Sequence, residues 1–176
     1  MTDERSFVRL AGRGRGPDGA LVTWTVAEGG RGRRWRETLV RDEVLVHSLL
    51  YETDSESRFS HLELATPTGL VTLHPEGDGS LHGNVIRPGS GVEHVVGMTV
   101  AVGSLVLVRG SIVASAAAAR AGQASADGAS PVVVLDPVTL SLSPATVDRV
   151  ALGPTDDRGV PVMDDARIWP LEDADG

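Results

Sequence analysis

Strict alternation of apolar and polar residues, repeated in about eight segments, is the feature that most constrains the fold of this chain. A period of two places every second side chain on the same face of an extended strand, so that one face can be buried. Short breaks containing Gly, Pro, Asp or Ser separate the segments and favour tight turns. The pattern predicts strands over residues 21–27, 33–40, 43–52, 58–65, 69–74, 80–86, 92–102 and 104–113.

The order of these strands predicts the fold class. No segment with helical periodicity lies between them, which indicates an antiparallel meander. We expect a mainly β protein whose sheet is strongly curved or forms a partial barrel, with one or two short helices. Alternation places Val22, Trp24 and Val26 on one face, so these side chains are expected in the core. A chain of 176 residues can bury one core, and residues 1–176 are expected to form a single domain.

The composition changes after the last of these strands. Residues 114–130 are rich in Ala, Gly and Ser and have no apolar stripe. Alanine favours helix, but few large side chains are present to offset the entropy of ordering this segment. We expect a short helix that decays into a flexible loop over residues 116–130, with a disordered linker as the alternative.

The C-terminal part is expected to return to β structure. The stretch "PVVVLDPVTLSLS" predicts one or two strands broken at its central Asp-Pro. Ser143 followed by Pro144 is a helix-start signal and predicts one or two helical turns. A turn and a final strand containing Trp169 follow, and the acidic tail over residues 172–176 is expected to fray.

Charge is unevenly distributed along the chain. Residues 1–41 hold nine Arg and five acidic residues, whereas the remainder holds seven Arg and nineteen acidic residues. The stretch "GGRGRRWRE" combines arginine with an aromatic residue, a combination that binds nucleic acids. The whole chain carries a net charge of −8 and repels phosphate backbones, so we predict no nucleic-acid partner. All 16 basic residues are Arg, a usage typical of a GC-rich bacterial genome.

The sequence also bears on location and cofactors. It begins with "MTDERSFVRL", which is charged where a signal peptide is apolar, and no apolar run is as long as a membrane-spanning helix. We therefore expect a soluble, cytoplasmic protein without an integral membrane segment. The chain has no Cys, which excludes disulfides and thiolate chemistry. The stretch "GRGRGPDG" at Gly12–Gly19 lacks the strand–helix context of a dinucleotide site, so we expect a flexible connection there and no cofactor.

Histidines are the best candidates for chemistry. The stretch "TLHPEGDGSLHGN" predicts a hairpin with a Gly-Asp-Gly loop, in which Gly79 takes the left-handed conformation. A similar loop at Gly89–Gly91 would set Ile86 opposite His94 and bring a third imidazole to the same side. Three imidazoles suit an open zinc site, but we favour a polar outer face without metal. The expected pairs of the first hairpin are His74 with His82, Thr72 with Asn84 and Leu70 with Ile86.

Candidate ligand-binding residues follow from these patterns. Adjacent acidic pairs in the C-terminal region indicate solvated turns, and single histidines within strands usually have a structural role. No catalytic residue is therefore assigned. The polar residues selected as candidate ligand-binding positions are Arg34, Arg36, His74, His82, Asn84 and His94.

Three stretches carry a resemblance to a known family. They are "RWRE" in an early strand, "GDGSLHGN" in mid-chain, and "DDRGVPVMDDARIWPLE", which looks like a closing Asp-Gly turn and aromatic strand. With its length and meandering strands, the chain resembles the bacterial glycolipid-binding family, a domain of unknown function. The family's central Thr-Pro, Thr-Asn, Leu-Pro run has no counterpart here. The resemblance implies a curved sheet that half-closes around an apolar ligand, and it assigns no functional residue.

Three functions are compatible with such a fold. We favour a non-enzymatic binding module that holds a lipid-like or other small apolar molecule in the concave face of the sheet. The first alternative is a small β-barrel hydrolase, isomerase or cyclase that uses His with Asp or Glu. The second is a protein–protein adaptor that uses the sheet edge and the Arg-rich hairpin. The oligomeric state is left open, a homodimer included.

Overall fold

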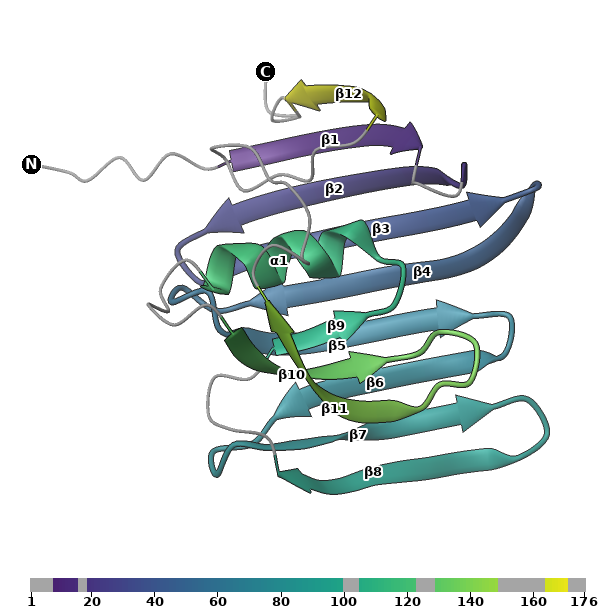
Figure 1. The fold of residues 1–176 in the computed structure, drawn as a ribbon, viewed down its shortest axis with the longest axis vertical. Coiled ribbons are helices and arrows are strands. Elements are labelled where there is room, and N and C mark those ends of the chain that lie inside the picture. Colours follow the sequence, from purple (N-terminus) through teal and green to yellow (C-terminus); the bar gives the residue numbers. More distant parts are fainter. Residues whose placement is uncertain (1–7, 16–18, 100–104, 123–128, 149–163, 171–176) are drawn as a thin grey trace, which may run out of the picture.

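The computed structural model describes residues 8–15, 19–99, 105–122, 129–148 and 164–170, and its main element is one large antiparallel sheet (Figure 1). Its strands are β1 (Val8–Arg15), β2 (Leu21–Gly29), β3 (Gly32–Arg41), β4 (Val44–Thr53), β5 (Phe59–Thr66), β6 (Gly69–Pro75), β7 (Ser80–Arg87), β8 (Gly91–Thr99) and β12 (Asp164–Pro170).

The large sheet is an open meander. Strands β1 to β8 lie side by side in chain order, and β12 pairs with β1, so that β12 and β8 are the two edges. Each of these pairs is antiparallel. The prediction of a mainly β protein with an antiparallel, curved meander is confirmed; the sheet does not close into a barrel.

A second layer covers one face of this sheet. It consists of the helix α1 (Ile112–Gly122) and a small sheet in the order β11-β10-β9, formed by β9 (Leu105–Val108), β10 (Ala129–Leu135) and β11 (Leu142–Asp148). Strand β9 is parallel to β10, and β11 is antiparallel to it. Helix α1 lies over β3 and β4 (Figure 1). We call the covered face of the large sheet the inner face and the opposite one the outer face.

The core lies between the two layers. Val22, Trp24 and Val26 are buried on the inner face of β2, as alternation predicts. They belong to one apolar cluster with Trp35 of β3 and Tyr51 of β4. The second layer contributes further side chains to this cluster, namely Val106, Val108, Val113, Ala114, Ala117, Val133, Leu135 and Leu140.

The predicted β6–β7 hairpin is confirmed. His74 lies opposite His82, Thr72 opposite Asn84 and Leu70 opposite Ile86, while Val71, Leu73, Leu81 and Val85 are buried on the other face. Gly79 has φ +84° and its N–H donates to the Glu76 carbonyl at 3.0 Å. This conformation is strained for any residue with a Cβ, which explains the glycine.

The predicted β7–β8 register is wrong by two residues. His94 lies opposite Asn84 instead of Ile86, because Arg87 pairs with Gly91 and the turn begins one residue earlier than expected. Pro88 occupies the first central position of this turn, where its ring fixes φ, and Gly89 occupies the second with φ +79°. A shift by two residues preserves the alternation, so the His94 side chain still lies on the outer face.

Three other expectations are wrong. The strand predicted over residues 104–113 ends at Val108, a turn follows at Arg109 and Gly110, and Ile112 already belongs to α1. The stretch Gly12–Arg15, expected in a flexible connection, belongs to β1. A Cβ on Gly12 would lie 2.3 Å from Cζ2 of Trp24, so the glycine leaves space for the indole. Ser143 and Pro144 lie in β11 rather than in a helix. Proline is tolerated there because β11 is an edge strand of the small sheet.

Helix α1 corrects the expected loop over residues 116–130. The helix continues to Gly122, Ala116–Ala119 are buried, and β10 begins at Ala129. A helix whose small apolar side chains face several directions is stable where it is enclosed, and here it packs against both sheets. Residues 123–128 and the tail over residues 172–176 lie outside the described residues.

Candidate functional site

All six candidate residues predicted from the sequence lie on the outer face of the large sheet. Arg34 and Arg36 alternate with the buried Trp35 on β3. The other four, His74, His82, Asn84 and His94, belong to β6, β7 and β8. Strands β4 and β5 separate the two groups, a distance of about 14 Å at normal strand spacing. The structure therefore brings them together as two groups on one surface and not as one site.

The histidine group is solvated. The ring centroids of His74 and His82 are 6.4 Å apart, and Glu76 Oε1 lies 3.2 Å from His74 Nε2 and 3.9 Å from His82 Nδ1. His94 Nδ1 lies 2.7 Å from Asn84 Oδ1. Within the described ranges, no group of three or more His, Cys, Asp or Glu side chains could hold a metal ion.

The arginine-rich hairpin is a network of ion pairs. Arg34 Nε donates to Glu52 Oε1 at 2.5 Å on the outer face. On the inner face, Arg33 pairs with Glu28 and lies over the ring of Trp35. Arg120 of α1 also donates to Glu28, at 3.1 Å. The carboxylates therefore neutralise part of this positive charge and connect α1 to β2.

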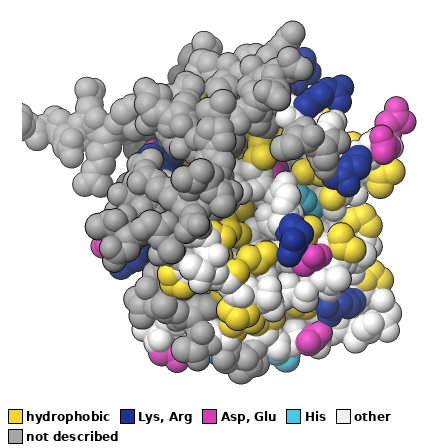
Figure 2. Space-filling view, viewed as in Figure 1, with side chains coloured by type: hydrophobic (Ala, Val, Ile, Leu, Met, Phe, Trp, Pro, Cys, Tyr) yellow, Lys and Arg dark blue, Asp and Glu magenta, His cyan; other side chains and the backbone are white. Residues whose placement is uncertain are grey.

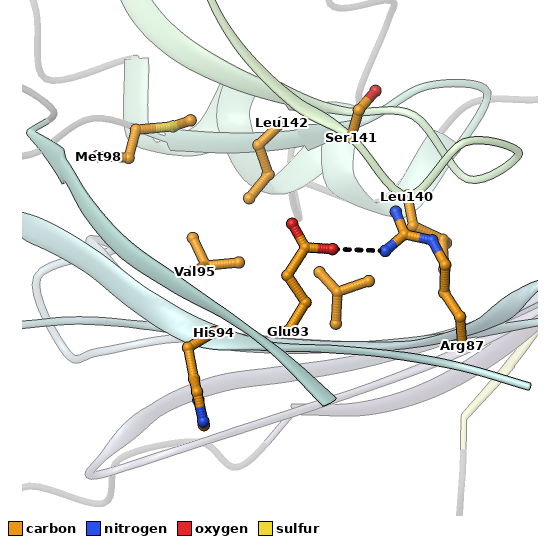
Figure 3. Close-up of a pocket in the computed structure, with 9 residues that line it drawn as sticks. Arg87, Glu93, His94, Val95, Met98, Leu140, Ser141 and Leu142 are labelled. Carbon is orange, nitrogen blue, oxygen red and sulfur yellow. Dashed lines mark hydrogen bonds and ion pairs between the residues drawn. The ribbon is translucent and has the colours of Figure 1, made fainter. Parts of the chain in front are cut away.

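The best candidate for a binding site is an open cleft of about 440 Å³ between the β7–β8 end of the large sheet and the start of β11 (Figure 3). We call it the β8 cleft. Val95, Met98, Leu140 and Leu142 point into it, whereas His94 points away from it (Figure 3). The residues that line it are Val85, Arg87, Glu93, His94, Val95, Met98, Leu140, Ser141 and Leu142.

The turn between β10 and β11 positions one wall of the β8 cleft. Asp136 Oδ1 accepts hydrogen bonds from the N–H groups of Val138 and Thr139, at 2.9 and 3.1 Å. The two backbone N–H groups, that of Thr139 first, hold the pKa of Asp136 below its ordinary value. Leu140 has φ +56°, a conformation that is rare for a branched residue, and its side chain is buried. The turn thus fixes Leu140 against the large sheet.

One ion pair stands at the polar end of the β8 cleft. Arg87 Nη1 donates to Glu93 Oε2 at 2.8 Å, and Arg87 Nη2 donates to the carbonyl of Thr139 at 3.0 Å. The side chain of Arg87 is 35% exposed and that of Glu93 is 72% exposed. Arg87 therefore joins the large sheet to the β10–β11 turn, while the largely exposed Glu93 side chain lies between Val95 and Arg87 in the cleft (Figure 3).

Sequence reasoning missed a buried polar pair beneath α1. Glu37 Oε1 lies 2.6 Å from His47 Nε2, and Glu37 Oε2 accepts the N–H of Val113 at 2.8 Å. The available signal was that Glu37 alternates in phase with Trp35 and Leu39 on the inner face. The bond from Val113 holds α1 on the sheet. Both members of the pair are about 1% exposed, so they are not accessible to a substrate in solution.

Tyr51, on the same face, is also enclosed. Burial raises the pKa of its hydroxyl well above the ordinary value, and the backbone of Val106 lowers it by a smaller amount. This side chain is therefore uncharged at physiological pH and belongs to the core.

Comparison of the chain with protein-family models, with curated proteins and with solved structures gave no match. In the part of the chain that the structure describes, no helix has the length and apolarity needed to cross a bilayer.

Proposed function

We propose that this protein is a non-enzymatic binding module that holds a small apolar, lipid-like molecule in the β8 cleft. The observation that carries the proposal is the wall of apolar side chains around this cleft: Val85, Val95, Met98, Leu140 and Leu142. Ligand sites are commonly concave, mostly apolar and equipped with few polar groups. On the side of the molecule that carries the second layer, apolar side chains reach the surface among paired arginine and acidic side chains (Figure 2).

The size of the cleft bounds the expected affinity. Burial of about 200 Å² of apolar ligand surface would contribute roughly 5 kcal/mol. The loss of translational and rotational freedom opposes this gain. We therefore expect a dissociation constant of about 0.2 mM or weaker for a simple apolar probe.

The resemblance to the glycolipid-binding family supports the same kind of ligand. It implies a curved sheet around an apolar molecule, and the β8 cleft lies on the inner side of the large sheet. The enzyme alternative has less support, because His94 is the one histidine that lines the cleft and its ring points away (Figure 3). Its neighbour Asn84 accounts for its orientation.

The test is binding of Nile red, a neutral apolar dye whose fluorescence rises in an apolar environment. Val95→Trp should fill the cleft and reduce the fluorescence gain at least about fivefold. The matched control is Val92→Trp, on the same strand but exposed on the outer face. Circular dichroism and thermal melting verify that both variants fold. Equal binding by the two variants would show that the dye does not occupy the β8 cleft and would overturn the proposal.

A further inference from the structure

We propose that Arg87 is the anchor for an anionic head group, so that the β8 cleft takes an amphiphile with one apolar chain and one carboxylate-like anion. This inference rests on the proposed function of the cleft and names the chemical class of its ligand. Arg87 stands where the apolar wall ends, beside Leu140 and on the far side of Glu93 from Val95 (Figure 3). A chain that lies along the wall would therefore carry its head group to the guanidinium.

Arg87 is held in place independently of Glu93. Its Nη2 donates to the Thr139 carbonyl at 3.0 Å, and Thr139 is itself held in the turn by Asp136. A guanidinium has five N–H donors in a rigid fork that matches a carboxylate or phosphate. Nη1 uses one N–H for Glu93 and Nη2 uses one N–H for Thr139, so three of the five donors are not used by these two bonds. The side chain can therefore accept a second anion without leaving its position.

Glu93 is the exchangeable member of the ion pair. Its side chain is 72% exposed, against 35% for Arg87. Ion pairs between exposed groups contribute little to stability because water solvates both charges. An incoming anion can therefore replace the Glu93 carboxylate at low cost, and the chain bound in the cleft shields the new ion pair from solvent.

A cationic head group fits the same geometry poorly. It would have to pair with Glu93 while lying next to the guanidinium of Arg87, 2.8 Å from the same carboxylate. Two cations that share one carboxylate lie close to each other and therefore repel. The arrangement of fixed cation and mobile anion thus favours an anionic ligand.

The experiment compares decanoate, decyl phosphate and decan-1-ol, which share one chain and differ in the head group. Calorimetric titration of the full chain, below the concentrations at which the probes form micelles, should show at least about tenfold tighter binding of an anionic probe than of the alcohol. The ratio of the dissociation constants of decanoate and decyl phosphate then shows whether the preferred head group is a carboxylate or a phosphate ester.

Two variants of the ion pair should act in opposite directions. Arg87→Gln should abolish the preference for the anions, so that decanoate and decyl phosphate bind no more tightly than decan-1-ol. Glu93→Gln should increase the ratio of anion affinity to decan-1-ol affinity several-fold, because the competing carboxylate is gone. The matched control is Arg58→Gln, which removes an exposed arginine that pairs with Asp54 outside the β8 cleft. It should change neither the affinity for the anions nor the affinity for decan-1-ol.

The outcomes separate this inference from the proposed function. Equal affinity for decanoate, decyl phosphate and decan-1-ol, unaffected by Arg87→Gln, would overturn the anchor role and leave the apolar cleft in place. Tighter binding of decylamine, lost in Glu93→Gln, would also overturn it, in favour of a cationic ligand. If Nile red and all four chains fail to bind the folded protein, both the proposed function and this inference are wrong.

Discussion

Glu37 and His47 form a hydrogen-bonded pair that is enclosed between β3, β4 and α1. Their side chains meet at 2.6 Å, and the second carboxylate oxygen accepts the N–H of Val113 in the first turn of α1. Backbone N–H groups at the start of a helix are otherwise unsatisfied, and a carboxylate there is also favoured by the helix dipole. Ser111 adds a second bond, from the N–H of Ala114 to its hydroxyl oxygen at 3.0 Å. The pair therefore determines where α1 begins on the sheet.

Removal of Glu37 should be strongly destabilising. Glu37→Ala leaves His47 and the N–H of Val113 buried without their partner, which should lower the free energy of unfolding by about 3–5 kcal/mol. Urea denaturation followed by circular dichroism measures this. The control is Glu63→Ala, which removes the partner of His61 in an exposed pair and should cost at most about 1 kcal/mol. Similar losses in the two variants would show that the buried pair has no special role.

A methyl group on Gly12 should not be tolerated. Its Cβ would lie 2.3 Å from the Trp24 ring, so Gly12→Ala should lower the free energy of unfolding by about 1–3 kcal/mol. Gly77→Ala is the control, because no atom outside its immediate chain neighbours lies within 4 Å of the added Cβ. Trp24→Leu should make room for the methyl group at position 12. Gly12→Ala should therefore lower the free energy of unfolding less when it is added to Trp24→Leu than when it is made in the parent chain. An additive double variant would mean that the two residues do not compete for space.

The tight fit of α1 should make larger side chains costly. Ala117 is 2% exposed between the helix and the large sheet, so Ala117→Leu should cost about 1–3 kcal/mol. Ala121 is half-buried, and Ala121→Leu serves as the milder control. Deletion of residues 112–122 should abolish cooperative unfolding, since it exposes the inner face of β3 and β4. Thermal melts of the three variants provide the measurement, and a cooperative melt of the deletion variant would contradict the packing.

Asp54 should make stability depend on pH. Partial burial raises its pKa, but the N–H groups of Arg58 and Glu56 and the Arg58 guanidinium together lower it, so the pKa lies below the ordinary value. A depressed folded-state pKa contributes stability that is present above the unfolded value and is lost as the pH falls through the folded value.

Asp54→Asn should therefore lower the denaturation midpoint at pH 7, and the difference from the parent chain should close as the pH falls below about 4. Arg58→Gln keeps the backbone N–H bond and should show part of the effect. Denaturation midpoints measured between pH 7 and pH 2.5 give the comparison. A difference that stays constant over this range would refute the role assigned to the carboxylate.

Zinc should bind the outer face weakly. In the described part of the chain, His74, His82 and Glu76 are not placed to share one metal ion, and His94 is bonded to Asn84. A tight zinc site requires at least three well-placed protein ligands. Calorimetric titration should give no dissociation constant tighter than micromolar; a tighter value that His82→Ala abolishes would show that the histidines form a metal site.

Alternation alone predicted β2 to β8 and which way their side chains point, but it missed β1 and continued the strand of β9 into the start of α1. In β2 it placed Trp24 with Val22 and Val26 in the core, and in the β6–β7 hairpin it selected the register that sets His74 opposite His82. These are local properties, because the pleat reverses the direction of each successive side chain and Gly79 permits the turn. The β7–β8 register was less determined, since Pro88, Gly89 and Gly91 allow more than one loop.

Only the tertiary structure decided what each face meets. Helix α1 has no apolar stripe, so its burial depends on the two sheets that enclose it. The partner of Glu37 in α1 lies 76 residues away, and Thr139 lies 52 residues from Arg87. A period of two says which face a side chain occupies, but it says nothing about which distant segment covers that face. The β8 cleft and the bond from Arg87 to the Thr139 carbonyl therefore come from the packing of the second layer.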